Sequence, residues 1–187
     1  MRRRDFIRYL GLGSVAVTIP EAMHAVPAAA TTLCSDKKTK PISGSWFEFQ
    51  HSAAEGGYWN EALAHFTADQ WRRKVFEIRE VGMEYLVLMG VARAGKPFYP
   101  SKIAPRIPMG CDDPLEAVLS AADECGIKFF VSNDFWGDLD AYNMMLDKGV
   151  QTVRFQAMEE IAERYSHHAC FYGWYFPNEA MLQPYFV

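Results

Sequence analysis

Residues 173–179, Gly-Trp-Tyr-Phe-Pro-Asn-Glu, carry the side chains best suited to chemistry. The aromatic run predicts a buried strand that ends at Pro177 and delivers Asn178 and Glu179. Parallel barrels place catalytic acids at the carboxyl ends of strands. Glycoside hydrolysis needs a carboxylic acid to protonate the leaving oxygen, and an apolar neighbour such as Trp174 would raise its pKa. We predict that Glu179 is this acid and that Asn178 holds a sugar hydroxyl. The alternative is a helix start.

A second set of candidates lies on the strand predicted over residues 45–50. Phe47 and Phe49 suit the layer against helices, so Glu48 and Gln50 are expected to point inward. Gln50, at the strand end, is placed to bind a substrate hydroxyl. Glu48 lies deeper, and its alternative role is a structural carboxylate hydrogen-bonded inside the fold.

The next candidates follow the strand predicted over residues 127–132. Asn133 and Asp134 could bind sugar hydroxyls, and Trp136 could stack on a sugar ring. The alternative is a helix-capping pair beside a core tryptophan. Tyr99, from the loop after the second strand, could reach the same cleft, although its proline neighbours make loop packing an equal alternative.

These candidates are positioned by alternating strands and helices. Helices are expected after Thr67 and from Asp113–Pro114, ending at Gly82 and Gly126. The remaining elements are strands over 45–50, 85–89, 127–132 and 171–176, and a helical region up to Tyr165 with a core face of Phe155, Met158, Ile161 and Tyr165.

This alternation predicts an α/β fold with a parallel sheet. A doubly wound nucleotide binder should show a Gly-rich loop directly after its first strand, and Gly56-Gly57 does not match. A partial (β/α)8 barrel is therefore favoured, with about four of its eight units. We expect either a truncated product or a dimer formed through the open half-barrel.

The first 30 residues resemble a twin-arginine export signal. Arg3-Arg4-Asp5-Phe6-Ile7 precedes a weakly apolar stretch that is too short to span a bilayer. Residues 31–43 read as a linker, and residues 44–187 as the barrel half. The expected destination is the periplasm or the exterior, with no membrane association beyond the signal. Leu33 before Cys34 argues against lipidation.

The net charge and the cysteine spacing argue against some classes of binding partner. The net charge of −4, with basic residues concentrated in the signal, argues against nucleic acid. The four cysteines form no metal-binding spacing, so no metal or cofactor is expected. Cys111 and Cys125 are the nearest pair for a disulfide, but buried thiols are favoured. His167-His168 reads as an ordinary turn.

The order of these features resembles a known family. Gly44-Ser45-Trp46-Phe47, Asp113-Pro114-Leu115 and Gly-Trp-Tyr-Phe-Pro-Asn-Glu are similar to exported bacterial glycosidase-like barrels, domain of unknown function 4434. The resemblance runs from about Gly44 to the end. It implies a barrel acting on carbohydrate, with Asn178-Glu179 similar to the acid/base pair that follows the fourth strand in retaining glycosidases, although Pro177 directly before the pair departs from that pattern.

The same resemblance limits the expected activity. In those glycosidases the nucleophile follows a seventh strand, which lies beyond the four units of this chain. We therefore expect this chain alone to be inactive as a hydrolase. The alternative function is a non-catalytic carbohydrate-binding or surface protein that uses Trp136, Trp174 and Tyr99 as stacking platforms.

Overall fold

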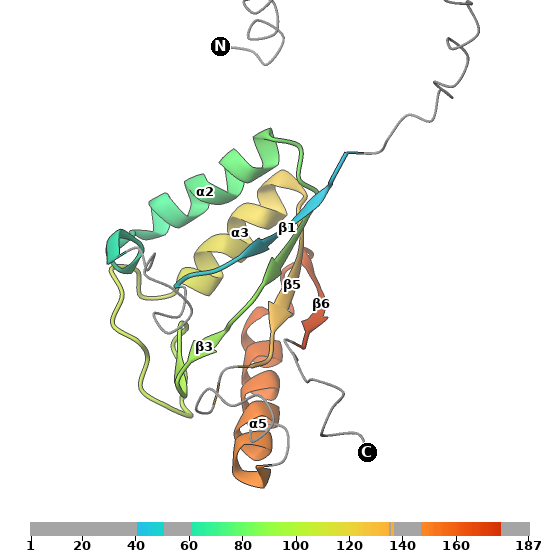
Figure 1. Ribbon diagram of the computed structural model, residues 1–187. Helices are drawn as coiled ribbons and strands as arrows, with labels where there is room; N and C mark the ends of the chain where they lie inside the picture. The colour runs from blue at the N-terminus through green and yellow to red at the C-terminus, as the bar shows by residue number, and fades with distance from the viewer. Residues whose placement is uncertain (1–40, 51–60, 135, 137–146, 177–187) are drawn as a thin grey trace, which may run out of the picture. The chain divides into compact units, whose positions relative to one another are not determined.

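Four parallel strands form one sheet (Figure 1). They are β1 (Gly44–Phe47), β2 (Tyr85–Leu88), β5 (Lys128–Ser132) and β6 (Phe171–Tyr175), in the order β1-β2-β5-β6. Each strand therefore pairs with its neighbour along the sequence, whereas a doubly wound sheet reverses its order at a switch point. The predicted α/β fold with barrel-type strand order is confirmed. The computed structural model describes residues 41–50, 61–134, 136 and 147–176, which lie within one unit, residues 41–187.

Two helices start and stop where the sequence predicts. Thr67 caps α2 (Ala68–Glu80) in a capping box with Gln70, and Gly82 follows the helix with φ +96°. Asp113 caps α3 (Pro114–Cys125), and Gly126 ends it in the left-handed conformation at φ 72°. A left-handed residue after a helix satisfies its last carbonyls and favours glycine. A short 3-10 helix, η2 (Glu61–His65), precedes α2.

The core lies between one face of the sheet and these helices. Leu86, Leu88, Phe129 and Val131 are fully buried on that face, and Trp71 of α2 packs against the rings of Phe47 and Phe49. The predicted stripe of α3, Leu115, Val118, Leu119 and Ala122, is also fully buried. Alternate strand residues thus point to the helices, as the apolar runs predict.

The third long helix, α5 (Lys148–Tyr165), presents a different face from the predicted one. Ile161 and Tyr165 are buried as expected, but Phe155 is 59% exposed. Arg154 and Glu160 take buried positions instead. The prediction failed here because an apolar pattern cannot reveal charged side chains whose partners come from distant segments.

A small hairpin interrupts the loop after β2. β3 (Ala92–Arg93) pairs antiparallel with β4 (Lys96–Pro97), and the two turn residues Ala94 and Gly95 both have positive φ, 48° and 73°. This is the geometry of a two-residue hairpin turn, which usually carries Asn-Gly or Asp-Gly. The hairpin could not be predicted from the sequence because alanine rarely occupies the first position of such a turn. Within the described residues, no helix is long and apolar enough to cross a membrane.

Candidate functional site

The carboxyl ends of β1, β5 and β6 lie at one edge of the sheet because the strands are parallel and adjacent in sequence order. Gln50 follows β1, and Asn133 and Asp134 follow β5. Pro177, Asn178 and Glu179 lie outside the described residues, although β6 ends at Tyr175, shortly before them. This edge is the candidate site.

The side-chain amide of Gln50, just after β1, is buried with its oxygen lacking a hydrogen bond. Phe47 and Phe49 face the helix layer, as predicted, with rings 6.0 and 5.2 Å from Trp71. Gln50 is only 8% exposed, and its Oε1 has no hydrogen-bond partner. Glu48 is half-buried and does make interactions. A buried amide oxygen without a partner costs about 1–3 kcal/mol, so Gln50 is able to accept a hydrogen bond from a ligand.

Asn133 links the end of β5 to β6 and to α5. Its backbone N–H donates to the carbonyl of Tyr175 over 3.1 Å, and its Nδ2 donates to Met158 Sδ of α5 over 3.5 Å. The side chain is fully buried, and its Oδ1 lacks a partner. Asn133 therefore makes a structural contact through Nδ2, while its Oδ1 can accept a hydrogen bond from a ligand.

Asp134 is held in a buried ion pair. Its Oδ2 accepts a hydrogen bond from Arg154 of α5 over 2.7 Å, and both side chains are less than a tenth exposed. Ser132 Oγ accepts a bond from the Asp134 backbone N–H at 3.1 Å. The carboxylate ties the strand end to α5, which was not among the roles considered from sequence.

Trp136 and Tyr99 pack inside the protein. Trp136 is 5% exposed and Tyr99 is fully buried, with their ring centroids 6.4 Å apart. The Tyr99 hydroxyl donates to Glu160 Oε2 over 3.0 Å. Burial raises the pKa of Tyr99, and the nearby Glu160 carboxylate adds to this rise. The packing alternatives describe these positions better than stacking platforms do, although the indole Nε1 of Trp136 is buried without a partner.

Glu160 organises the loop that follows β4. Besides Tyr99, its carboxylate accepts bonds from Ser101 Oγ at 2.6 Å and from the Lys102 backbone N–H at 2.7 Å. Three donors satisfy a buried carboxylate that would otherwise be costly to desolvate. This arrangement fixes the loop, and with it Tyr99, on α5.

Trp174 points away from the concave face of the sheet. It is in register with Val131, which is fully buried against the helices, and its ring lies 5.2 Å from Phe171. The next residue, Tyr175, takes the concave face, where its ring meets Trp46 at 5.0 Å. Glu179 lies outside the described residues, so the expectation that Trp174 offers a ring beside it stays a prediction. Tyr175 is an aromatic residue of the concave face that was not singled out from the sequence.

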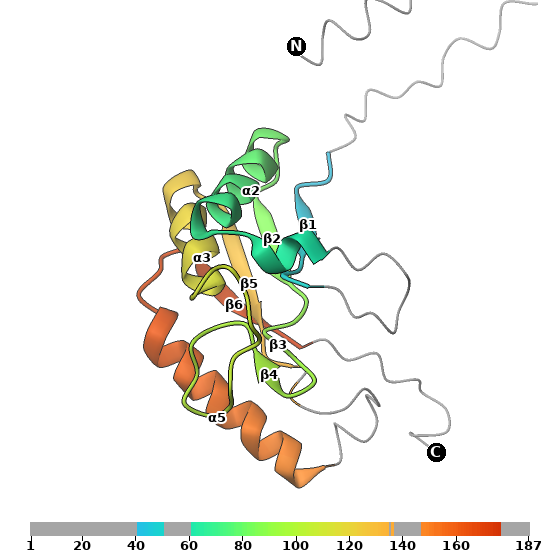
Figure 2. The same ribbon diagram turned by 90° about the vertical axis from the view of Figure 1, so that its left-hand side faces the viewer.

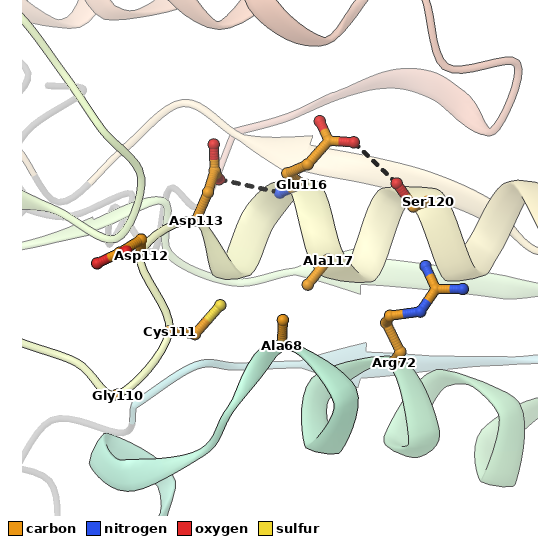
Figure 3. A pocket seen from close by; sticks show the side chains of 9 residues that line it. All are labelled: Ala68, Arg72, Gly110, Cys111, Asp112, Asp113, Glu116, Ala117 and Ser120. Carbon is orange, nitrogen blue, oxygen red and sulfur yellow. Dashed lines mark hydrogen bonds between the residues drawn. The ribbon is translucent and has the colours of Figure 1, made fainter.

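A cavity of about 490 Å³ lies between the first turns of α2 and α3 (Figure 3). Its polar groups are already partnered. Asp113 accepts bonds from Glu116 N and from the Tyr165 hydroxyl, while Arg72 pairs with Glu124 at 2.5 Å. Burial raises the pKa of Asp113 in spite of these bonds. This cavity lies among the helices, and none of the unpartnered buried polar atoms of the described residues lines it.

A charged cluster lies before the amino end of β6. His168 is buried, with Nδ1 2.7 Å from Asp123 Oδ2 and Nε2 3.1 Å from Glu116 Oε2. Burial alone would lower the pKa of His168, but the bonds to Asp123 and Glu116 outweigh it and raise the pKa. Beyond the ordinary turn predicted for His167-His168, the His168 side chain links the segment before β6 to α3.

The three cysteines of the described residues are free thiols, as predicted. Cys111, Cys125 and Cys170 are free, and burial raises the pKa of Cys170, with the Asp123 carboxylate adding to the effect. The ligand atoms of Asp123, His168 and Cys170 lie within 4.8 Å of one another, as do those of Glu116, His167 and His168. Within these groups His168 is hydrogen-bonded to Asp123 and Glu116, and the Cys170 backbone N–H donates to Asp123 Oδ1 over 2.6 Å.

Residues 42–186 match the family model described as "Domain of unknown function (DUF4434)". The chain belongs to this family. No curated protein sequence matches it. The DUF4434 chain is similar in structure to a protein assigned as an alpha-L-fucosidase from Bacteroides thetaiotaomicron VPI-5482, with TM-score 0.51 and 13% identity over 84% of this chain and 47% of that one.

A second similar structure is a GH29 alpha-L-fucosidase from Bacteroides thetaiotaomicron, with TM-score 0.44 and 18% identity over 71% of this chain and 38% of that one. The DUF4434 chain thus spans less than half the length of either protein. At this identity the first likeness establishes the fold alone. The α/β fold of this chain matches about half of a fucosidase barrel chain.

Proposed function

We propose that this chain is the sugar-binding, acid-bearing half of a glycoside hydrolase-like barrel. The observation that carries the proposal is the position of β6. It is the fourth strand of a sequentially ordered parallel sheet, and in the sequence Asn178 and Glu179 follow its carboxyl end directly after Pro177. Carboxyl ends of barrel strands carry catalytic residues, and an acid there suits protonation of a glycosidic oxygen.

The described residues support a carbohydrate ligand at the same edge. Gln50 Oε1 and Asn133 Oδ1 are buried acceptors without partners, and Trp136 Nε1 is a buried donor without one. A sugar hydroxyl both donates and accepts hydrogen bonds, so it matches such a mixed set. The similar structures are named as alpha-L-fucosidases, which makes α-L-fucosides the first ligand class to try.

Glu179 takes the role of general acid in this proposal, and Asn178 that of a ligand to a sugar hydroxyl. Gln50 and Asn133 position the sugar. Asp134 contributes indirectly, because its ion pair with Arg154 fixes the loop that carries Trp136. The second carboxylate of a two-carboxylate mechanism is not assigned to any residue of this chain.

Binding is tested by titrating the full chain with a panel of glycosides that includes 4-nitrophenyl α-L-fucoside, using calorimetry. We expect Gln50→Leu to weaken binding about 10-fold, as loss of one hydrogen bond of about 1.4 kcal/mol implies. Gln156→Leu is the matched control, because Gln156 is exposed on α5. Absence of binding across the panel would contradict any carbohydrate function.

Catalysis is tested by following nitrophenol release in the same samples. Release that is abolished by Glu179→Gln, with binding retained, supports the acid role. Glu159→Gln, at an exposed position on α5, is the control. Because no second carboxylate is assigned in this chain, binding without release in the unmodified chain agrees equally with the acid role and with the alternative, a carbohydrate-binding protein without catalysis.

A further inference from the structure

The concave face of the sheet carries aromatic side chains that no described helix covers. Figure 2 shows α2, α3 and α5 together on the other side, and the buried core packs there. On the concave face, Trp46 is 56% and Tyr172 54% exposed, although both belong to strands. Large exposed aromatic patches mark surfaces that associate with other molecules.

The rings on this face already contact one another across the sheet. The Tyr172 ring lies 5.2 Å from Phe130 and 6.2 Å from Tyr85, and Trp46 meets Tyr175 at 5.0 Å. The last contact joins the first strand to the fourth. The sheet therefore curls as a barrel wall does, and its concave side is an aromatic surface open to a partner.

The two outer strands of the sheet, β1 and β6, also have no pairing partner on their outer sides within the described residues. β1 pairs only with β2, and β6 pairs only with β5. An edge strand presents a row of N–H and C=O groups to any strand that runs in a compatible direction. A partner that covers the concave face can therefore also continue the sheet at two places.

We propose that a second copy of this chain covers the concave face, with β6 of each copy lying parallel beside β1 of the other. A two-fold axis along the axis of the curl keeps all strands parallel and makes the two junctions identical. A closed (β/α)8 barrel has eight parallel strands, and two copies of this four-stranded sheet supply that number. A second copy has the required strand number, direction and curvature.

The charge on the face is also compatible with a second copy. Lys128 lies on it, and its ammonium is held over the rings of Tyr172 and Tyr85, at 4.6 and 5.3 Å. These cation–π contacts stabilise the ammonium within its own chain, and Lys128 is the first residue of β5, at the amino end of the sheet. The partner surface should be aromatic and apolar, which is the character of the same face in the second copy.

The test is the mass of the full chain in solution, measured by light scattering after size exclusion over a range of concentrations. We expect twice the chain mass of 21.3 kDa. Trp46→Glu should raise the Kd of the dimer at least about 30-fold, as expected of a central aromatic anchor. Phe155→Glu is the matched control, because Phe155 is an equally exposed aromatic residue on α5, and it should leave the Kd unchanged.

Hydrogen exchange on the unmodified chain is an independent readout. Amides of β1 and β6 should gain protection as concentration rises, while those of α5 should not. A folded monomer at about 100 μM, a value well above the Kd of a specific interface, would overturn the proposal. So would a polydisperse aggregate, or equal loss of the dimer in Trp46→Glu and Phe155→Glu.

Discussion

The rings of Trp46 and Tyr175 lie 5.0 Å apart although they stand on the first and last strands of a four-stranded sheet. In a flat sheet these strands would be separated by three spacings, about 14 Å. The contact therefore requires the sheet to curl about an axis that runs along the strands, so that its two outer strands approach each other. This curl brings the strand ends toward a common mouth and leaves a concave aromatic face, so both proposals depend on it.

Replacing His168 should give a pH-dependent loss of stability. Its pKa is raised by Asp123 and Glu116, whose own pKa values are lowered by bonds to His168 despite partial burial. The histidine contribution is full below its unfolded pKa of about 6.5 and is lost as pH rises through the folded value. The carboxylate contributions are present above about pH 4 and are lost as pH falls through their lowered folded pKa values.

We therefore expect His168→Gln to lower the free energy of unfolding by about 2 kcal/mol near pH 5.5, and by clearly less at pH 9. Urea denaturation at the two pH values measures the difference. His167→Gln is the control, because His167 is the exposed neighbour. An equal loss at both pH values would mean that the imidazolium does not carry the interaction.

Removing the Tyr99 hydroxyl should destabilise the protein by about 1–2 kcal/mol. Tyr99→Phe leaves the buried Glu160 carboxylate with two donors in place of three, the Ser101 hydroxyl and the Lys102 N–H. Tyr172→Phe should change the free energy of unfolding by less than about 0.5 kcal/mol, because that side chain is 54% exposed. Thermal or urea unfolding compares the two. Equal effects would contradict the assigned network.

Breaking the Asp134–Arg154 pair should be costlier than removing it entirely. Asp134→Ala leaves a buried guanidinium without its acid, and such truncations cost about 3–5 kcal/mol. The double variant Asp134→Leu with Arg154→Met removes both charges and should recover a large part of that loss. Equilibrium unfolding of the single and double variants measures the coupling. A double variant less stable than Asp134→Ala would contradict the prediction, because it would show that the unpaired guanidinium is not what destabilises the single variant.

The order of elements and most of their ends could be predicted from the sequence because local chemistry determines them. The Thr67 capping box, Pro114 after Asp113, and the glycines at 82 and 126 act within one helical turn. The apolar runs of β2 and β5 likewise reveal strands buried on a helix-facing side. Strand order then followed from the alternation of strands and helices.

Features that depend on distant partners could not be predicted. Arg154 is buried because Asp134 pairs with it, and Glu160 because the loop after β4 donates hydrogen bonds to it. Neither partner is adjacent in sequence. The orientation of Trp174 depends on a register irregularity between β5 and β6, near Phe129 and Phe130, which shifts the simple alternation. The predicted roles of Glu179 and Asn178 stay predictions, because these residues lie outside the described part of the chain.

The curl of the sheet is tested most directly by nuclear Overhauser effects between the indole protons of Trp46 and the ring protons of Tyr175. Isotope-filtered samples separate contacts within one chain from contacts between copies. A curled sheet predicts strong effects within one chain, since the ring centroids are 5.0 Å apart. Their absence in a folded sample, with the expected effects between β1 and β2 present, would contradict the half-barrel and both proposals that rest on it.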